Sequence, residues 1–185
     1  MGRIFSAVVL FALSGASALA QSGGDTFSDR GDGDKAHISG FVCPLRIGDF
    51  ERDAVGEADP ERQSDFCAYS ARDGVYGTIR LTPLSGGYDA KTALAPDFGE
   101  QESTGGKRIA EQTISLDGGD LSIYTRTYRT ARAEALEYRI LFAGAAVKNW
   151  VVEATVEYAD PRDTREQADF LQAVYTAAVK EIAAK

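Results

Sequence analysis

The sequence predicts an α+β fold, in which an antiparallel β-sheet of hairpins has one face covered by a long C-terminal helix. Two patterns support this prediction. Runs of alternating apolar and polar residues are separated by short turn sequences, as in β-hairpins. The last stretch of the chain repeats its apolar residues every three or four positions, as an amphipathic helix does. With 185 residues, of which 44% are apolar and 26% charged, the chain suits one globular domain.

The N-terminus matches a secretory signal peptide over residues 1–20. Arg3 supplies a positive charge, residues 4–13 are apolar, and Ala18–Ala20 ends in an A-x-A cleavage signature. The apolar run is too short to span a bilayer as a helix. We therefore expect a periplasmic or secreted protein whose mature chain is not stably inserted in a membrane.

Residues 21–37 are rich in Gly, Ser and Asp, which predicts a flexible linker before a single domain at residues 38–185. The only histidine, His37, falls at the end of this linker. Ser-His-Asp and Cys-His mechanisms need a histidine held against a nucleophile. A histidine in a flexible linker cannot meet that requirement, so no such mechanism is expected.

Three β-hairpins are expected in the domain. They pair residues 65–72 with 75–82, 113–116 with 121–130, and 136–142 with 150–158. Asp73-Gly74 favours a type I′ turn in the first hairpin, and the small-residue stretch 143–149 connects the third.

Alternation divides the predicted sheet into an apolar face and a polar face. Trp150, Val152 and Val156 lie on the apolar face, and we place Ile140 and Phe142 on an apolar face as well. This apolar side of the sheet must be covered by another element.

The C-terminal helix is the expected cover. It follows Asp160-Pro161, and Thr164 with Gln167 predicts a capping box. Its apolar stripe consists of Leu171, Val174, Tyr175, Ala178 and Ile182. A second short helix is an open alternative between Tyr88 and Glu102, where Pro96 and Gly99 interrupt the pattern.

Cys43 and Cys67 are the only cysteines, and export places them in an oxidising compartment. We therefore predict a structural disulfide between them. A redox-active pair is the less favoured alternative, because the two residues lack the close spacing of a C-x-x-C motif.

The sequence excludes several functions. A net charge of −8 and a pI near 4.7 disfavour nucleic-acid binding. One histidine and two cysteines are too few for a structural zinc site, and no cofactor is expected. Glu153 and Glu157 could form a catalytic carboxylate pair, but ion pairs with Arg139 or Arg126 are the simpler interpretation.

One group of Tyr and Arg residues qualifies as a candidate binding site. Tyr and Arg are enriched at binding hot spots, and several arginines on one face can hold an anionic ligand or an acidic partner. The alternative is a solvated face neutralised by glutamates. The candidate residues are Tyr76, Arg80, Tyr124, Arg126, Tyr128 and Arg139.

The order of these elements resembles the α/β sandwich of the PsbP, Mog1 and DcrB group. The similar segments are Val75–Leu81, Trp150–Tyr158 and Phe170–Tyr175. Members of that group act as extrinsic photosystem subunits, GTPase-release factors or bacterial envelope proteins. The resemblance therefore implies binding or scaffolding rather than a reaction.

Together these observations predict an exported, non-enzymatic protein of the cell envelope that binds a partner or supports an assembly. A carrier of a small anionic ligand is the alternative, and a hydrolase of unrecognised type is a third.

Overall fold

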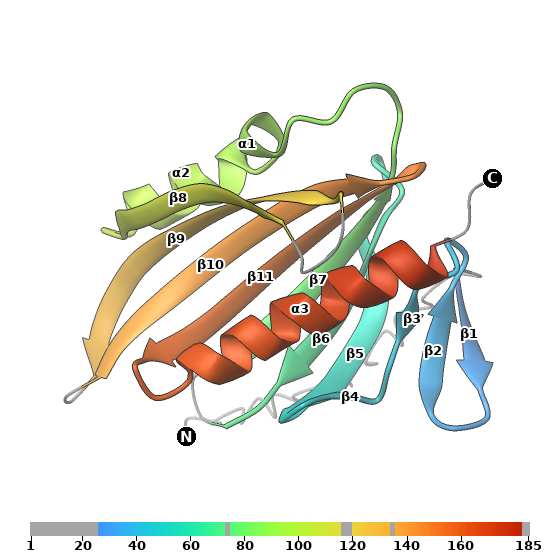
Figure 1. Ribbon diagram of the computed structural model, residues 1–185, viewed down its shortest axis with the longest axis horizontal. Coiled ribbons are helices and arrows are strands. Elements are labelled where there is room, and N and C mark those ends of the chain that lie inside the picture. The colour runs from blue at the N-terminus through green and yellow to red at the C-terminus, as the bar shows by residue number, and fades with distance from the viewer. Residues whose placement is uncertain (1–25, 73–74, 116–119, 134–135, 183–185) are drawn as a thin grey trace, which may run out of the picture.

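The computed structural model describes residues 26–72, 75–115, 120–133 and 136–182, so the predicted signal peptide lies outside the described residues. Within them, the main element is an eight-stranded antiparallel sheet with the order β4-β5-β6-β7-β11-β10-β9-β8 (Figure 1). The strands are β4 (Arg46–Ile47), β5 (Phe50–Asp59), β6 (Ser64–Ser70), β7 (Tyr76–Pro83), β8 (Lys107–Ser115), β9 (Ser122–Ala133), β10 (Leu136–Val147) and β11 (Trp150–Asp160). The predicted α+β class and all three predicted strand pairings are confirmed.

The C-terminal helix α3 (Thr164–Glu181) crosses one face of this sheet, as predicted (Figure 1). Phe170, Val174 and Tyr175 are buried between the helix and the sheet. Burial of this apolar stripe is the main source of stability for such a helix. Among the described helices, none combines the length and apolarity that a membrane crossing requires.

The predicted capping box is not formed at the start of α3. The N-cap residue is Asp163, one position earlier, and its Oδ2 accepts a hydrogen bond from the Ala159 amide at 3.1 Å. The Thr164 hydroxyl donates to Asp160 Oδ1 at 2.8 Å instead of capping the helix. The side chain of Gln167 is therefore not used at the helix terminus.

Residues 26–37 are ordered in a hairpin, so the linker prediction is wrong for this segment. Strands β1 (Phe27–Arg30), β2 (Asp34–His37) and β3 (Val42–Cys43) form a small antiparallel sheet beside α3. Its composition is polar, but the Phe27 and Trp150 rings each lie 5.0 Å from the His37 ring. The contact with Trp150 joins the hairpin to the large sheet, so a segment that local composition predicts to be flexible is ordered. Residues 21–25 lie outside the described residues.

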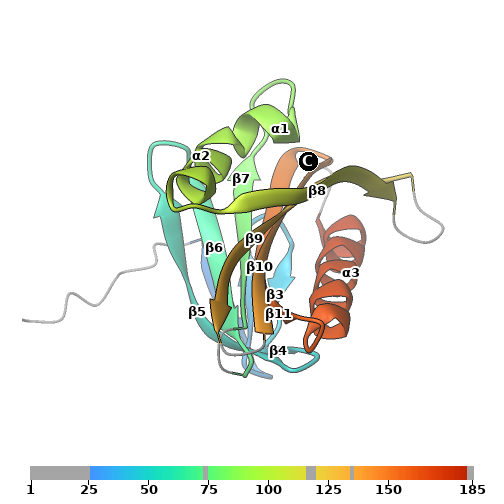
Figure 2. The same ribbon diagram turned by 90° about the vertical axis from the view of Figure 1, so that its left-hand side faces the viewer.

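The opposite face of the sheet is partly covered by two short helices, α1 (Ala90–Ala93) and α2 (Ala95–Ser103) (Figure 2). They confirm the expected second helical region, and Pro96 lies in the first turn of α2, where its missing N–H is tolerated. Leu94 and Phe98 form a second apolar cluster with Tyr128 and Phe142. This face is therefore not simply solvated.

Strand β10 continues through the small-residue stretch 143–147, so the prediction that this stretch belongs to a connection is wrong. Ala143 and Ala145 are buried toward α3, whereas Phe142 faces α2. The predicted placement of Phe142 with Trp150 on one face is wrong, because both faces of this strand are covered. Gly144 lies so close to the helical layer that an added Cβ would stand 2.3 Å from the Tyr88 hydroxyl.

Candidate functional site

The structure divides the six predicted site residues between two faces of the sheet. Tyr76, Arg80, Tyr124, Arg126 and Tyr128 lie on the face turned away from α3, as the strand registers require. Arg139 is directly opposite Tyr158, whose side chain belongs to the α3-side core. Directly opposed residues share a face of an antiparallel pair, so the placement of Arg139 with the other five is wrong.

Arg126 and Tyr128 are buried beneath α2 rather than displayed to solvent. The Arg126 guanidinium carbon lies 3.9 Å from the centre of the Phe98 ring, a cation–π arrangement. Its Nη1 donates to the Tyr128 hydroxyl at 3.3 Å, and this hydroxyl donates to Glu102 Oε1 at 3.0 Å. These contacts attach α2 to β9.

Glu111 on edge strand β8 neutralises the surrounding cations. Its carboxylate lies 3.0 Å from Lys91, 2.8 Å from Arg108 and 3.1 Å from Arg126. The hydrogen bond from Lys91, reinforced by Arg126, lowers the pKa of Glu111 to about 2. The carboxylate therefore stays ionised and joins α1, β8 and β9.

A different group of residues surrounds Glu153 in the centre of the same face. Glu153 is only 7% exposed; Arg80 Nη1 donates to its Oε2 at 3.3 Å and the Tyr88 hydroxyl to its Oε1 at 3.1 Å. Burial raises the pKa of Glu153, although Arg80 and Tyr88 oppose the shift. Burial and the neighbouring Glu153 also raise the pKa of Tyr88.

Glu153 lines a pocket of about 570 Å³, which we call the Glu153 pocket. Its walls come from the β5–β6 turn, the end of β7 and the segment that leads into α1. Three acidic residues and one basic residue line the pocket, namely Glu61, Asp89, Glu153 and Arg62. A buried carboxylate with a shifted pKa in a pocket is a marker of functional sites.

The arginines expected to hold an anion already have carboxylate partners. Arg80 lies 3.3 Å from Glu153, Arg126 lies 3.1 Å from Glu111, and Arg139 lies 2.7 Å from Asp160. An incoming anion would meet the negative charge of the carboxylate that already lies beside each guanidinium. The geometry therefore disfavours an anion site built from these arginines. The suggested pairing of Glu153 with Arg126 or Arg139 is also wrong, because its partner is Arg80.

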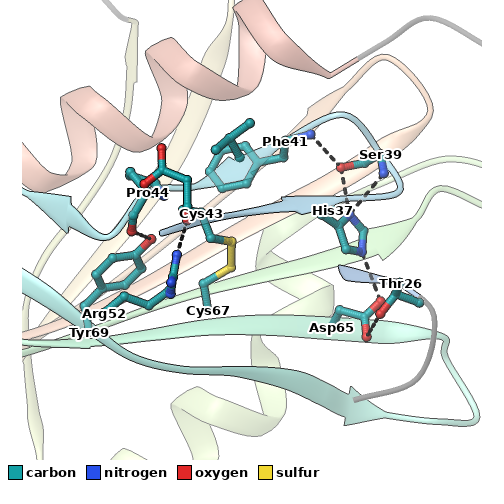
Figure 3. The surroundings of a disulfide bond; sticks show 12 residues. Thr26, His37, Ser39, Phe41, Cys43, Pro44, Arg52, Asp65, Cys67 and Tyr69 are labelled. Carbon is teal, nitrogen blue, oxygen red and sulfur yellow. Dashed lines mark hydrogen bonds and ion pairs between the residues drawn. A yellow bond between two sulfur atoms is a disulfide. The ribbon is translucent and has the colours of Figure 1, made fainter. Parts of the chain in front are cut away.

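His37 lies in a rigid network rather than in a flexible linker (Figure 3). Its Nε2 is 3.0 Å from Asp65 Oδ2, and its Nδ1 is 2.8 Å from the Ser39 hydroxyl. The Ser39 amide donates to Nδ1 at 3.1 Å, so Nδ1 is the acceptor and Nε2 carries the proton toward Asp65.

This Ser-His-Asp network has a structural role in the conformation observed. The Ser39 hydroxyl accepts a hydrogen bond from the Phe41 amide at 3.1 Å, and Ser39 is 1% exposed. A nucleophile must be reachable by substrate. The prediction that His37 is mobile, on which the sequence excludes a catalytic triad, is wrong. The burial of Ser39 is instead the observation that argues against its action as a nucleophile.

The predicted disulfide between Cys43 and Cys67 is confirmed, and both residues are fully buried (Figure 3). It links β3 to β6, beside the hydrogen bond from the Tyr69 hydroxyl to the Pro44 carbonyl at 3.1 Å. Among the described residues, no group of three or more His, Cys, Asp and Glu side chains is placed to hold a metal ion.

Sequence reasoning missed Tyr88 and the position of Glu153 in a pocket. A glutamate inside the apolar run of β11 is the signal that could have identified Glu153 as a special position. Comparison with models of known protein families finds no match to this chain, and comparison with curated proteins finds no similar sequence. The Glu153 pocket is therefore defined by its geometry alone.

Proposed function

We propose that this protein is an exported, non-catalytic binding protein that holds a small amine-bearing ligand in the Glu153 pocket. The main support for this proposal is the buried Glu153 carboxylate, which lies in a pocket with more acidic than basic side chains. Arg80 and Tyr88 each donate one hydrogen bond to this carboxylate, which has room to accept more. A ligand ammonium would add to these donors and further offset the unfavourable burial of the charge. Affinity would then rise as the pH rises through the raised pKa of Glu153.

Two features support export. The N-terminal sequence matches a secretory signal, and the Cys43–Cys67 disulfide suits an oxidising compartment. Cell fractionation, combined with thiol alkylation before and after reduction, tests this part of the proposal. Mature protein in the envelope or medium, alkylated only after reduction, is expected; full-length protein with free thiols in the cytosol would overturn it.

A thermal-shift panel tests the ligand class. It contains polyamines, amino sugars, amino-acid amides and inorganic anions, and it compares wild type with Glu153→Gln. Glu157→Gln is the matched control, because Glu157 lies on the same strand and face but does not line the pocket. Amines should stabilise wild type and the control but not Glu153→Gln. Stabilisation by anions alone would instead support the anion-carrier alternative.

The same variants separate a small ligand from a protein partner. Tagged mature protein is used for capture from the native envelope fraction, with mass spectrometry as the readout. A partner retained equally by wild type and Glu153→Gln, together with no response to amines, would favour assembly support over the proposed ligand binding.

A further inference from the structure

A second cavity lies on the other face of the sheet, between α3 and strands β8, β9 and β10. It has a volume of about 260 Å³, and we call it the α3 groove. Ile114, Ile123 and Leu141 line it from the three strands, and Leu171 lines it from the helix. The small sheet β1–β3 packs elsewhere on this face and does not line the groove.

The α3 groove differs chemically from the Glu153 pocket. None of the side chains that line it carries a charge, although 26% of the residues in the whole chain are charged. A charged ligand group would lose its hydration there without gaining an ionic partner. An uncharged ligand with an apolar body meets no such penalty.

One polar side chain in the groove lacks a partner. Gln167 is 7% exposed, and its carboxamide makes no hydrogen bond to any other described residue. Gln167 does not act at the helix start, where Asp163 occupies the N-cap position without a side-chain capping hydrogen bond. A carboxamide offers one acceptor and two donors. The carboxamide atoms of Gln167 are not among the fully enclosed polar atoms without a partner, so they are open to the groove. Gln167 can therefore offer hydrogen bonds to a molecule in the groove.

We propose that the α3 groove binds a free neutral amphiphile. Its aliphatic chain would lie among Ile123, Leu141 and Leu171, and an amide, hydroxyl or ester group would pair with Gln167. This site is independent of the Glu153 pocket, because the two cavities lie on opposite faces of the sheet.

Isothermal titration calorimetry with octanamide tests the proposal on the mature protein. Octanoate and octylammonium are the charged analogues of the same chain length. Octanamide should bind, and both charged analogues should bind at least about tenfold more weakly because the groove offers no counter-charge. Equal binding of all three compounds, or no binding of octanamide, would overturn the proposal.

Gln167→Leu tests the polar contact. This variant keeps a similar volume, so octanamide affinity should fall about fivefold, the equivalent of one hydrogen bond. The unliganded variant should unfold at about the same temperature, because the substitution removes no hydrogen bond to another described residue. A lower unfolding temperature, or an unchanged affinity for octanamide, would show that Gln167 serves the fold instead and would contradict the proposal.

Ala168→Phe tests the location. Ala168 is exposed at the rim of the groove, and a phenyl group there should block entry of the chain. Ala173→Phe is the matched control, since Ala173 is also exposed on α3 but does not line the groove. Octanamide should bind the control normally and Ala168→Phe poorly. Equal binding to both variants would place the ligand elsewhere.

Discussion

Nε2 of His37 lies 3.0 Å from Oδ2 of Asp65 and joins the N-terminal hairpin to strand β6 of the large sheet. Both residues are buried. Two positions after Asp65 on the same strand, Cys67 forms the disulfide with Cys43. The segment β1–β3 is therefore attached to β6 by a hydrogen bond at one end and by a covalent bond at the other.

Asp65→Ala should loosen this hairpin. The substitution removes the acceptor of both His37 and the Thr26 hydroxyl, and loss of such buried partners destabilises by about 1–3 kcal/mol. Hydrogen exchange should show lost amide protection in β1 and β2, with α3 unchanged. Asp29→Ala is the control, because Asp29 is exposed in the same hairpin. Equal effects of the two substitutions would contradict the assigned role of Asp65.

Removal of the disulfide should destabilise the whole domain. Its two cysteines are 24 positions apart, and closing a loop of this size stabilises the folded state by about 2–4 kcal/mol. Urea unfolding of Cys43→Ala/Cys67→Ala should show a lower midpoint than oxidised wild type. Reduced wild type should match the double variant; a midpoint independent of reductant would argue against the bond.

Gly77→Ala should destabilise the contact between β7 and α3. An added Cβ at Gly77 would stand 2.7 Å from the buried Phe170 ring, and such overpacking destabilises by about 1–3 kcal/mol. Gly99→Ala is the control, because nothing lies within 4 Å of the added atom. Alanine at this helical position should raise the free energy of unfolding by about 0.5–1 kcal/mol. Both free energies of unfolding can be measured in urea. An unchanged free energy of unfolding for Gly77→Ala would contradict the close packing of Gly77 against Phe170.

The stability of the protein should depend on pH through Glu153. Burial raises its folded-state pKa above the ordinary value of 4.5, so the folded state binds this proton more tightly than the unfolded state. The free energy of unfolding should therefore fall as the pH rises from 4.5 through the raised pKa. Denaturant unfolding across this range should show a weaker dependence for Glu153→Gln.

Burial also raises the pKa of Glu157, which contributes a slope of the same sign. Glu153→Gln/Glu157→Gln should therefore depend on pH less than either single variant. Identical pH profiles for wild type and Glu153→Gln would show that the Glu153 carboxylate does not titrate in this range.

Features with a local signal were predictable from the sequence. The alternating runs predict β6, β7, β9 and β11, and the three-to-four-residue apolar repeat predicts α3, because each pattern depends only on the geometry of its own element. The disulfide was predictable because the chain has two cysteines and therefore offers one pairing. The site residues were only partly predictable: Arg80 does face the pocket region, but its partners are distant in the chain.

Composition alone wrongly predicts that residues 26–37 are flexible. This polar hairpin is ordered through its attachment to the large sheet, which provides Asp65, Trp150 and Cys67 as partners of β1–β3. Local sequence patterns also cannot show which faces of a strand are covered by other elements. Alternation shows that Phe142 and Ala143 point in opposite directions, but not that helices cover both sides of their strand.

The sequence by itself determined three strand pairings, the long amphipathic helix, the cysteine pair and the acidic charge of this protein. Only the tertiary structure decided which carboxylate meets which arginine and where cavities lie. Glu153 is 65 positions from Tyr88 and 73 positions from Arg80 in the chain. A pattern read along neighbouring residues carries no information on such contacts, because strand register and packing bring them together only in the folded state.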